Sequence, residues 1–376
     1  MGEIIAGIII GPTVMGQLAP GFYDVVFPKT GSMSLVLDVM VQLSVIMLLF
    51  VAGLEVQLHL LKKQTKPAVL TSVFSIVIPF IVGFGCVWLQ PEFFHAEQNN
   101  LLPYALFLGV AMSISALPVI IRILMDLGIF KTDIGRVIIA SELISDVVGW
   151  LLFSVVLSLL RGQTNFADIA LNVFYVTAFI VFMFTLGRRI IDHRVRWIAN
   201  HMSSPGAVIS FLMGMCFLGA ALTEAMGTHA IMGAFVMGIA FGSSPHLAAQ
   251  PRDITHQFVT SVFAPLFFVS IGLRVNFTQE FDVQLIFAVL FIAIICKLLG
   301  AGLGARLGGM TQRESLAVGF GLNARGAMEI ILGTIAFNAG LIGQSLFVAL
   351  VIMALVTSIM SGPLMMRFID EKKFNL

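Results

Sequence analysis

The chain contains apolar blocks that are long enough to cross a lipid bilayer. A membrane-spanning α-helix needs about 20 consecutive apolar residues, and polar breaks divide this sequence into twelve apolar segments. Their approximate bounds are 2–16, 35–54, 68–89, 102–124, 134–160, 167–186, 205–222, 228–241, 258–273, 284–307, 315–339 and 345–368. Only 11% of the residues are charged, whereas a soluble domain carries about 25%. The sequence therefore predicts an all-α integral membrane protein with twelve transmembrane helices.

Charge and cysteine content exclude several classes of protein. The net charge of +1 argues against nucleic-acid binding, which needs a basic patch. Cys86, Cys216 and Cys296 lie far apart inside apolar segments and lack metal-ligand spacing, so we expect structural thiols and no cofactor. No phosphate-binding loop and no nucleophile–base pair is visible, and we therefore expect a membrane protein that is not an enzyme.

The distribution of Lys and Arg between the loops predicts an orientation. Alternate connections place sixteen basic residues on one side and three, Lys29, Arg161 and Arg274, on the other. The sixteen are Lys62, Lys63, Lys66, Arg122, Lys131, Arg136, Arg188, Arg189, Arg194, Arg196, Arg252, Arg306, Arg313, Arg367, Lys372 and Lys373. This side, which includes the C-terminus, should be cytoplasmic, and the expected location is a bacterial inner membrane.

The two halves of the chain resemble each other. Segment 2–16 is similar to segment 228–241, and segment 35–54 is similar to segment 258–273. Matched segments start on opposite sides of the membrane, which is the inverted repeat of many secondary transporters. We expect a single membrane unit over 1–376 without a soluble regulatory domain. Its parts are a first repeat at about 1–160, a linker helix at 167–186 and a second repeat at about 205–368.

Segment 205–222 has no partner in the first repeat. A complete chain should then have a thirteenth helix before Met1, and we expect an N-terminal truncation; the alternative is a genuine protein of twelve helices.

Ionisable residues at membrane depth are costly, and each one is a candidate for function. Asp146 lies near the middle of segment 134–160, one turn after Glu142. One interpretation is a structural acid that is paired with a neighbouring base. The other is a carboxylate that holds a proton and a metal cation in turn, with the Ser145 hydroxyl and backbone carbonyls as further oxygen ligands.

Two predicted helices are interrupted at corresponding places of the two halves. Ser113 and Ser115, whose hydroxyl groups we also expect to bind the ion, precede Pro118. This proline removes a helical hydrogen bond and frees carbonyl groups. The matching segment contains Asn323 and Arg325, followed by a glycine. Paired interrupted helices are the best indication in a sequence of a transporter's binding site.

The remaining charged residues inside the membrane need partners. Lys297 lies in the middle of segment 284–307, and Asp146 is its expected partner, although Lys297 could also serve only to brace a helix. Arg325 and Glu329 are four residues apart and can pair on one helix, while Glu142 is another candidate partner for Arg325. We interpret Glu142, Asn323, Arg325 and Glu329 as bracing groups, because arginine keeps its charge.

Several motifs together resemble the cation:proton antiporter-2 family. They are residues 2–12, residues 117–124, residues 132–136, Ser145-Asp146 with Trp150, and residues 323–326. The resemblance extends over nearly the whole chain, and the motifs occur in the order that they have in the family.

The resemblance implies a sodium/proton antiporter-like fold of 12 or 13 helices. Its core would carry two crossed, discontinuous helices and move like an elevator, and its scaffold domain would form a homodimer. Asp146 matches the family's essential ion-binding aspartate, and Lys297 resembles a basic residue that electrogenic sodium/proton members pair with it. The family has Asp, Asn or Gln before this aspartate, so Ser145 departs from the pattern and leaves the stoichiometry open.

The sequence thus predicts exchange of Na⁺ or K⁺ for H⁺ by alternating access, with both ions competing for Asp146. One alternative on the same fold is a sodium-coupled carrier of organic anions, which would need a larger polar cavity. Others are a non-transporting membrane sensor or subunit, and a channel, for which no filter or ring of charges is visible.

Overall fold

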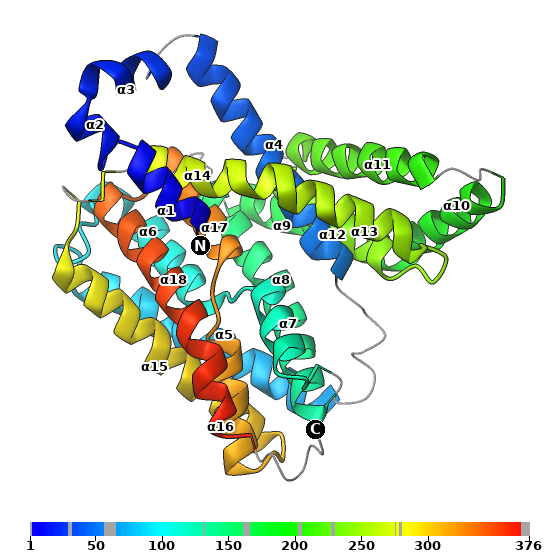
Figure 1. Cartoon of the computed structure of the whole chain (residues 1–376). Helices are drawn as coiled ribbons and strands as arrows, with labels where there is room; N and C mark the ends of the chain where they lie inside the picture. The colour runs from blue at the N-terminus through cyan, green and yellow to red at the C-terminus, as the bar shows by residue number, and fades with distance from the viewer. Residues whose placement is uncertain are drawn as a thin grey trace. The chain divides into compact units, whose positions relative to one another are not determined.

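The computed structural model describes residues 2–28, 32–55, 65–130, 132–160, 166–201, 205–226, 230–274, 276–277 and 280–369, and every regular element in these ranges is helical (Figure 1). The chain divides into two compact units. Unit 1 contains Met1–Leu58 and Ala170–Glu280, and unit 2 contains His59–Ile169 and Phe281–Leu376. Each predicted repeat therefore contributes to both units. Seven of the basic residues on which the predicted orientation depends lie outside the described residues, namely Lys29, Lys62, Lys63, Lys131, Arg161, Lys372 and Lys373.

Unit 1 contains four helices from the first part of the chain and six from its middle. They are α1 (Gly2–Ile10), α2 (Met15–Leu18), α3 (Pro20–Val26), α4 (Ser32–Glu55), most of α9 (Phe166–Phe182), α10 (Arg188–His201), α11 (Pro205–Ala225), α12 (Ala230–Gly242), α13 (Ala249–Phe258) and α14 (Ala264–Arg274). Short π-helical segments join α9 to α10 and α13 to α14 without a break.

Unit 2 contains the two interrupted helices. Its elements are α5 (Thr65–Leu89), a 3₁₀ turn (Gln98–Asn100), α6 (Leu101–Ser113), α7 (Leu117–Asp126), α8 (Asp133–Leu160), α15 (Val283–Leu307), α16 (Gln312–Leu322), α17 (Ala327–Asn338) and α18 (Gln344–Met366). Thr311 and Glu314 form a reciprocal capping box at the start of α16. Asp282 caps α15, and the hydrogen bond from the Leu285 amide lowers the pKa of this carboxyl group.

Each of the twelve predicted segments overlaps a helix. Within the described ranges, eight helices are long and apolar enough to cross a membrane. These are Met33–Glu55, Lys66–Leu89, Asp133–Leu160, Val173–Ile198, Pro205–Ala225, Ala249–Leu273, Val283–Leu307 and Gln344–Met366. The other four segments are the short α1 and α12 and the interrupted pairs α6–α7 and α16–α17. At 13 residues, α12 is about 20 Å long, which is less than the hydrocarbon thickness of a bilayer.

Two predicted boundaries are wrong. The segment predicted at 167–186 continues as a helix to His201, and the one predicted at 258–273 begins at Ala249. Both extensions are polar, and hydropathy alone therefore marks them as loops. In α10, Ile191 and Val195 are buried four residues apart while Arg194 is exposed, so this polar stretch has the one-sided pattern of a packed helix.

Glycines allow the helices of unit 1 to cross at backbone distance. A Cβ atom at Gly53 of α4 would overlap the Phe235 carbonyl of α12, and one at Gly238 of α12 would overlap the Phe50 carbonyl of α4. In the same way, a Cβ at Gly7 of α1 would overlap the Val269 carbonyl of α14. Such small-residue crossings are how membrane helices associate closely.

Unit 2 is built around the adjacent helices α5 and α15. α5 packs against α6, α8 and α15, and α15 packs against α16 and α18. A Cβ at Gly109 of α6 would lie 2.9 Å from the Phe80 carbonyl of α5, and one at Gly319 of α16 would lie 3.0 Å from the Leu298 carbonyl of α15. The two interrupted helices are thus held against α5 and α15 by equivalent glycine contacts.

Replacing Gly53 by alanine should destabilise unit 1 by about 1–3 kcal/mol, because the added methyl group has no room at the crossing with α12. Gly214→Ala in α11 is the matched control: nothing lies within 4 Å of its Cβ position, and alanine there should stabilise the helix by about 0.5–1 kcal/mol. Thermal unfolding of the purified protein in detergent measures both. Equal melting temperatures for the two variants would contradict the close crossing.

Candidate functional site

The two helix interruptions of unit 2 lie in contact with each other. The Ala116 amide donates to the Ala324 carbonyl at 3.0 Å, and Ser115 Oγ donates to the Leu322 carbonyl at 2.6 Å. A Cβ at Gly326 would lie 3.2 Å from the Ala116 side chain, so the glycine allows this approach. Unwound backbone at membrane depth is tolerated only where protein or a polar cavity satisfies it.

Pro118 explains why the first interruption lies at this point. It stands in the first turn of α7, and because proline has no N–H it cannot donate to the carbonyl four residues earlier, which belongs to Ile114. The residue before a proline also avoids helical backbone angles. The last carbonyl groups of α6 are consequently left for other donors.

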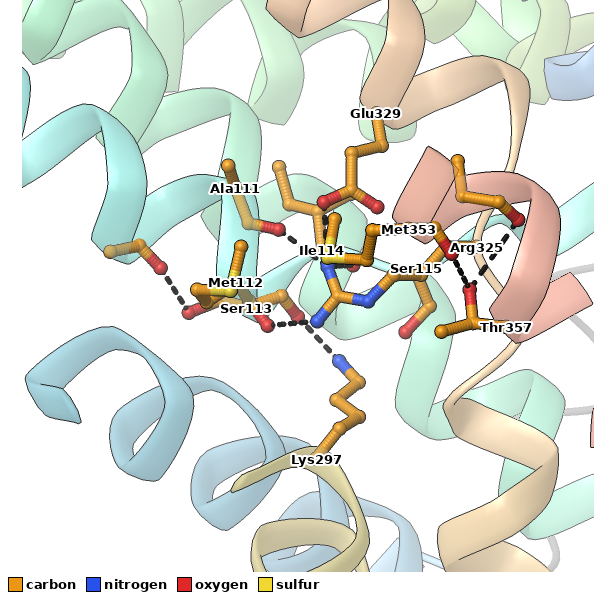
Figure 2. A network of polar contacts seen from close by, with 12 residues as sticks. Ala111, Met112, Ser113, Ile114, Ser115, Lys297, Arg325, Glu329, Met353 and Thr357 are labelled. Atoms are coloured by element: carbon orange, nitrogen blue, oxygen red, sulfur yellow. Dashed lines mark hydrogen bonds and ion pairs between the residues drawn. The ribbon is translucent and has the colours of Figure 1, made fainter. Parts of the chain in front are cut away.

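Arg325 donates to these carbonyl groups. Its Nη1 donates to the carbonyls of Ala111 at 2.6 Å and Ile114 at 3.2 Å, and its Nη2 donates to that of Met112 at 2.6 Å (Figure 2). Nη1 also pairs with Glu329 Oε1 at 2.7 Å, and both side chains are fully buried. A guanidinium suits this position because its donors are spread over a plane and its charge complements the negative end of a helix.

Lys297 approaches the same helix end from α15 (Figure 2). Its Nζ donates to the carbonyl of Ser113, and a second, longer hydrogen bond of 3.5 Å goes to the carbonyl of Ser75 on α5. The side chain is fully buried. The expected ion pair with Asp146 is not formed among the described residues, because the ammonium group binds backbone carbonyls instead.

Glu142 binds the unwound backbone after α6. Its Oε1 accepts a hydrogen bond of 3.0 Å from the Ser115 amide, while its Oε2 is buried without a partner among the described residues. The alternative pairing of Glu142 with Arg325 is not formed in this part of the structure. Glu142 thus holds an amide group at the interruption, whereas Arg325 holds carbonyl groups.

Asp146 faces the interruption but binds nothing there. Glu142, Asp146 and Gly149 recur on one face of α8 at four- and three-residue spacing. Glu142 bonds to Ser115, and a Cβ at Gly149 would lie 2.7 Å from the Ile114 side chain, so Asp146 lies between two contacts with the unwound segment. The Asp146 side chain is fully buried, and neither carboxylate oxygen has a hydrogen-bond partner among the described residues.

The predicted serine ligands are buried and donate their hydrogens to backbone carbonyls. The single hydroxyl hydrogen of Ser113 is within reach of the carbonyls of Gly109 at 2.8 Å and Ile76 at 3.0 Å, and Ser145 Oγ donates to that of Ser141 at 3.0 Å. Such a hydroxyl keeps oxygen lone pairs that can accept from another group. Asn323 differs, because neither atom of its buried amide has a partner among the described residues, which is not the behaviour of a bracing group.

Sequence reasoning missed three hydroxyl groups on α5. Thr71, Ser72 and Ser75 are all fully buried, and Ser72 Oγ lies 3.3 Å from Ser145 Oγ. The sequence does indicate a polar patch on this helix, because three hydroxyl residues within five positions interrupt an otherwise apolar segment. It was overlooked because serine and threonine are common in membrane helices and carry no charge.

Comparisons with known proteins identify the family of the chain. The family model of the transmembrane sodium/hydrogen exchanger matches residues 1–368. K⁺/H⁺ antiporter 1 of Saccharomyces cerevisiae is 31% identical over 385 residues, which cover 97% of this chain but only 42% of that protein. The Na⁺/H⁺ antiporter NhaS4 of Synechocystis is 30% identical over 371 residues, which cover 98% of this chain and 90% of that protein.

A solved structure shares the fold. The sodium proton antiporter MjNhaP1 from Methanocaldococcus jannaschii superposes with a TM-score of 0.60 at 17% identity, over 96% of this chain and 88% of that one. The family match over nearly the whole chain and the two antiporter relatives establish more than the fold. They show that the chain belongs to the sodium/hydrogen exchanger family of monovalent cation:proton antiporters, which are multi-pass membrane transporters and not enzymes.

Proposed function

We propose that the chain exchanges a monovalent cation, Na⁺ or K⁺, for H⁺ across a membrane, and that the two ions compete for Asp146. The observation that carries the proposal is the state of this carboxylate. It is fully buried, lies on the face of α8 that contacts the first interruption, and has no hydrogen-bond partner among the described residues. A buried charge without a partner costs several kcal/mol, and a bound cation or a proton removes that cost.

The balance of buried charges supports the same proposal. The fully buried ionisable side chains in the described part of unit 2 are Glu142, Asp146, Glu329, Lys297 and Arg325. Three carboxylates and two basic groups leave an excess of one negative charge when all are ionised. Either one proton or one monovalent cation neutralises this excess, so each ion excludes the other. Mutual exclusion at one site is what couples the two fluxes in opposite directions.

The ligands proposed for the cation are all oxygens, as a hard alkali ion requires. We assign the Asp146 carboxylate as the charged ligand and the hydroxyl oxygens of Ser145, Ser113 and Ser115 as neutral ones. The positions of Ser113 and Ser115 support this assignment, because Ser113 ends α6 and Ser115 lies in the interruption that follows it. Lys297 is the neighbouring positive charge, which lowers the affinity of the carboxylate for the cation and for the proton.

Arg325, Glu329 and Glu142 have a different role in this account. Arg325 satisfies three carbonyl groups of the first interrupted helix, and Glu329 balances its charge. Glu142 satisfies the Ser115 amide. We assign all three to holding the unwound backbone in place for ion binding.

We further infer twelve membrane segments arranged as an inverted repeat. The order of the segments supports this repeat. The two short segments are the first and the eighth, and the two interrupted segments are the fourth and the eleventh, so both pairs are seven segments apart. Gly109 and Gly319 occupy equivalent positions in the interrupted helices and make equivalent backbone contacts. Such repeats carry alternating access in secondary transporters, and we propose that unit 2 moves as the core.

The orientation and assembly complete the proposal. The excess of Lys and Arg on one side supports a cytoplasmic C-terminus in a bacterial inner membrane. The family resemblance supports a homodimer through unit 1, which would serve as the scaffold.

Asp146→Asn should abolish cation-driven proton flux, because a neutral amide neither holds a proton nor offers a charge to the cation. Dequenching of a pH-sensitive dye in proteoliposomes measures the flux after addition of Li⁺, Na⁺, K⁺ or Rb⁺, and the order of responses gives the selectivity. Asp126→Asn, at an exposed carboxylate on α7, is the matched control. Undiminished exchange by Asp146→Asn would refute the proposal.

Lys297→Gln should lower the pH dependence or the charge coupling of exchange. The glutamine amide can still donate to the Ser113 and Ser75 carbonyls, so the main loss is the positive charge. Transport current on a solid-supported membrane across a pH series measures this, with Lys66→Gln at an exposed position as control. If the current and the pH profile stayed unchanged, Lys297 would be a structural group only.

Arg325→Lys should destabilise the protein by about 3 kcal/mol or more, because one ammonium group cannot reach three carbonyls and a carboxylate in this plane. Arg122→Lys is the control, since the Arg122 side chain is 86% exposed. Thermal unfolding in detergent compares the two variants. A melting temperature of Arg325→Lys equal to that of the control would contradict the bracing role.

A further inference from the structure

Glu142 uses only one of its two carboxylate oxygens to hold the unwound backbone. Its Oε1 accepts a hydrogen bond of 3.0 Å from the Ser115 amide. Its Oε2 is fully buried and has no hydrogen-bond partner among the described residues. A carboxylate has lone pairs for about four contacts, and a buried charge without a partner costs several kcal/mol. Bracing of the backbone therefore accounts for only part of this side chain.

A second carboxylate without partners lies one helical turn away. Asp146 follows Glu142 by four residues on α8, and side chains at this spacing are neighbours, with Cβ atoms about 5–6 Å apart. The Cα–Cβ bonds of a helix tilt toward its N-terminus, so the Asp146 side chain leans toward the turn that carries Glu142. Three buried oxygens, Glu142 Oε2 and both of Asp146, thus lie on neighbouring turns of α8 and lack partners in the described part of the chain.

The buried basic groups of unit 2 do not pair with these two carboxylates. Arg325 pairs with Glu329 at 2.7 Å, and Lys297 donates to two backbone carbonyls. Because Arg325 and Glu329 neutralise each other, the charges of Glu142, Asp146 and Lys297 remain, and they sum to −1 when all three groups are ionised. The excess negative charge of this core therefore belongs to the pair of Glu142 and Asp146, and not to Asp146 alone.

A monovalent cation fits between the two carboxylates. Like charges four residues apart on a helix repel each other, and the repulsion is stronger in a low-dielectric interior than in water. A cation that binds both groups removes this repulsion, and carboxylate oxygens are suitable ligands for a hard alkali ion. One positive charge balances the excess of one negative charge. A divalent ion would instead leave an excess positive charge beside Lys297.

The contact with Ser115 places Glu142 at the interruption. Ser115 is one of the neutral ligands that we assign to the cation, and Glu142 is hydrogen-bonded to its backbone amide. Asp146 is placed less directly, by the contacts that Glu142 and Gly149 make on either side of it. Of these two acidic residues, Glu142 is thus the one with a direct hydrogen bond to the unwound segment.

We propose that Glu142 is a second charged ligand of the transported monovalent cation: its Oε2 binds the cation together with Asp146, while its Oε1 holds the Ser115 amide. The inference rests on the proposed function, because it adds a ligand to the same site. The cation is then the partner that Oε2 lacks. Because one side chain holds both the unwound backbone and the ion, the fit of the site depends on the size of the ion.

Glu142→Gln separates the two functions of this side chain. The amide oxygen of glutamine can still accept from the Ser115 amide, whereas the negative charge is lost. In proteoliposomes the apparent KM for the cation should rise at least about tenfold, as for the loss of one partner in a buried group of charges. Asp133→Asn is the matched control, because it removes an exposed carboxylate from the same helix. It should leave the KM within about twofold of the parent.

Ion selectivity distinguishes a ligand from a charge that acts at a distance. A distant charge changes the KM of Li⁺, Na⁺, K⁺ and Rb⁺ by one common factor, whereas loss of a ligand changes the ratios between ions of different size. In Glu142→Gln these ratios should change. Glu142→Asp keeps the charge but shortens the side chain by one methylene group, and it should change the ratio of the KM values for Na⁺ and K⁺ by at least about threefold.

Infrared difference spectra test the same ligand without transport. Replacing choline by saturating Na⁺ should shift the carboxylate stretching bands of two side chains in the parent and of one in Glu142→Gln. Parental KM values, a KM that rises by one common factor for all four ions, or a parental infrared spectrum in Glu142→Gln overturns the second ligand. If this variant folds poorly, Glu142→Asp carries the test, and an unchanged selectivity there overturns the proposal. Retained exchange in Asp146→Asn would instead overturn the proposed function.

Discussion

Backbone carbonyl groups left without partners at the end of α6 are the constraint on which this core depends. No water is available at membrane depth to satisfy them, and Pro118 removes the one helical donor that the Ile114 carbonyl would have. Lys297 of α15 donates to one of these carbonyls. Arg325, from the second interruption, donates to three others. Two helices more than 200 residues apart in sequence are thereby fixed to each other at the point where both unwind.

These hydrogen bonds explain why the Asp146 carboxylate has no basic partner among the described residues. Arg325 donates to three carbonyls and to Glu329, Lys297 donates to two carbonyls, and Glu142 accepts from the Ser115 amide. The core has thus used its positive charges to stabilise backbone, and the Asp146 carboxylate is left buried without a partner among the described residues. A bound cation or proton would remove the cost of this buried charge, and that is the physical basis of the exchange that we propose for Asp146.

The sequence predicted the parts of this structure that depend on local chemistry. Apolar runs marked the helices, Pro118 marked an interruption, and charge at membrane depth marked Asp146, Lys297 and Arg325. It did not predict which atoms these charges bind, because Lys297 meets the Ser113 carbonyl only after α15 and α6 have packed together. Thr71 and Ser75 were missed because hydroxyl residues are common in membrane helices, and only the structure shows that these two lack their usual partner. The extension of α9 into the polar α10 could be predicted only from the helical periodicity of its apolar residues, because its mean hydropathy is that of a loop.

The central claim is that the proton and the cation share one site. It is tested most directly by the apparent KM for the transported cation, measured in proteoliposomes at several pH values that are equal on both sides of the membrane. Competition predicts that this KM rises about tenfold for each unit by which pH falls in the acidic range, while the maximal rate stays constant. An apparent KM that does not change with pH, with only the maximal rate falling in acid, would contradict a shared site at Asp146.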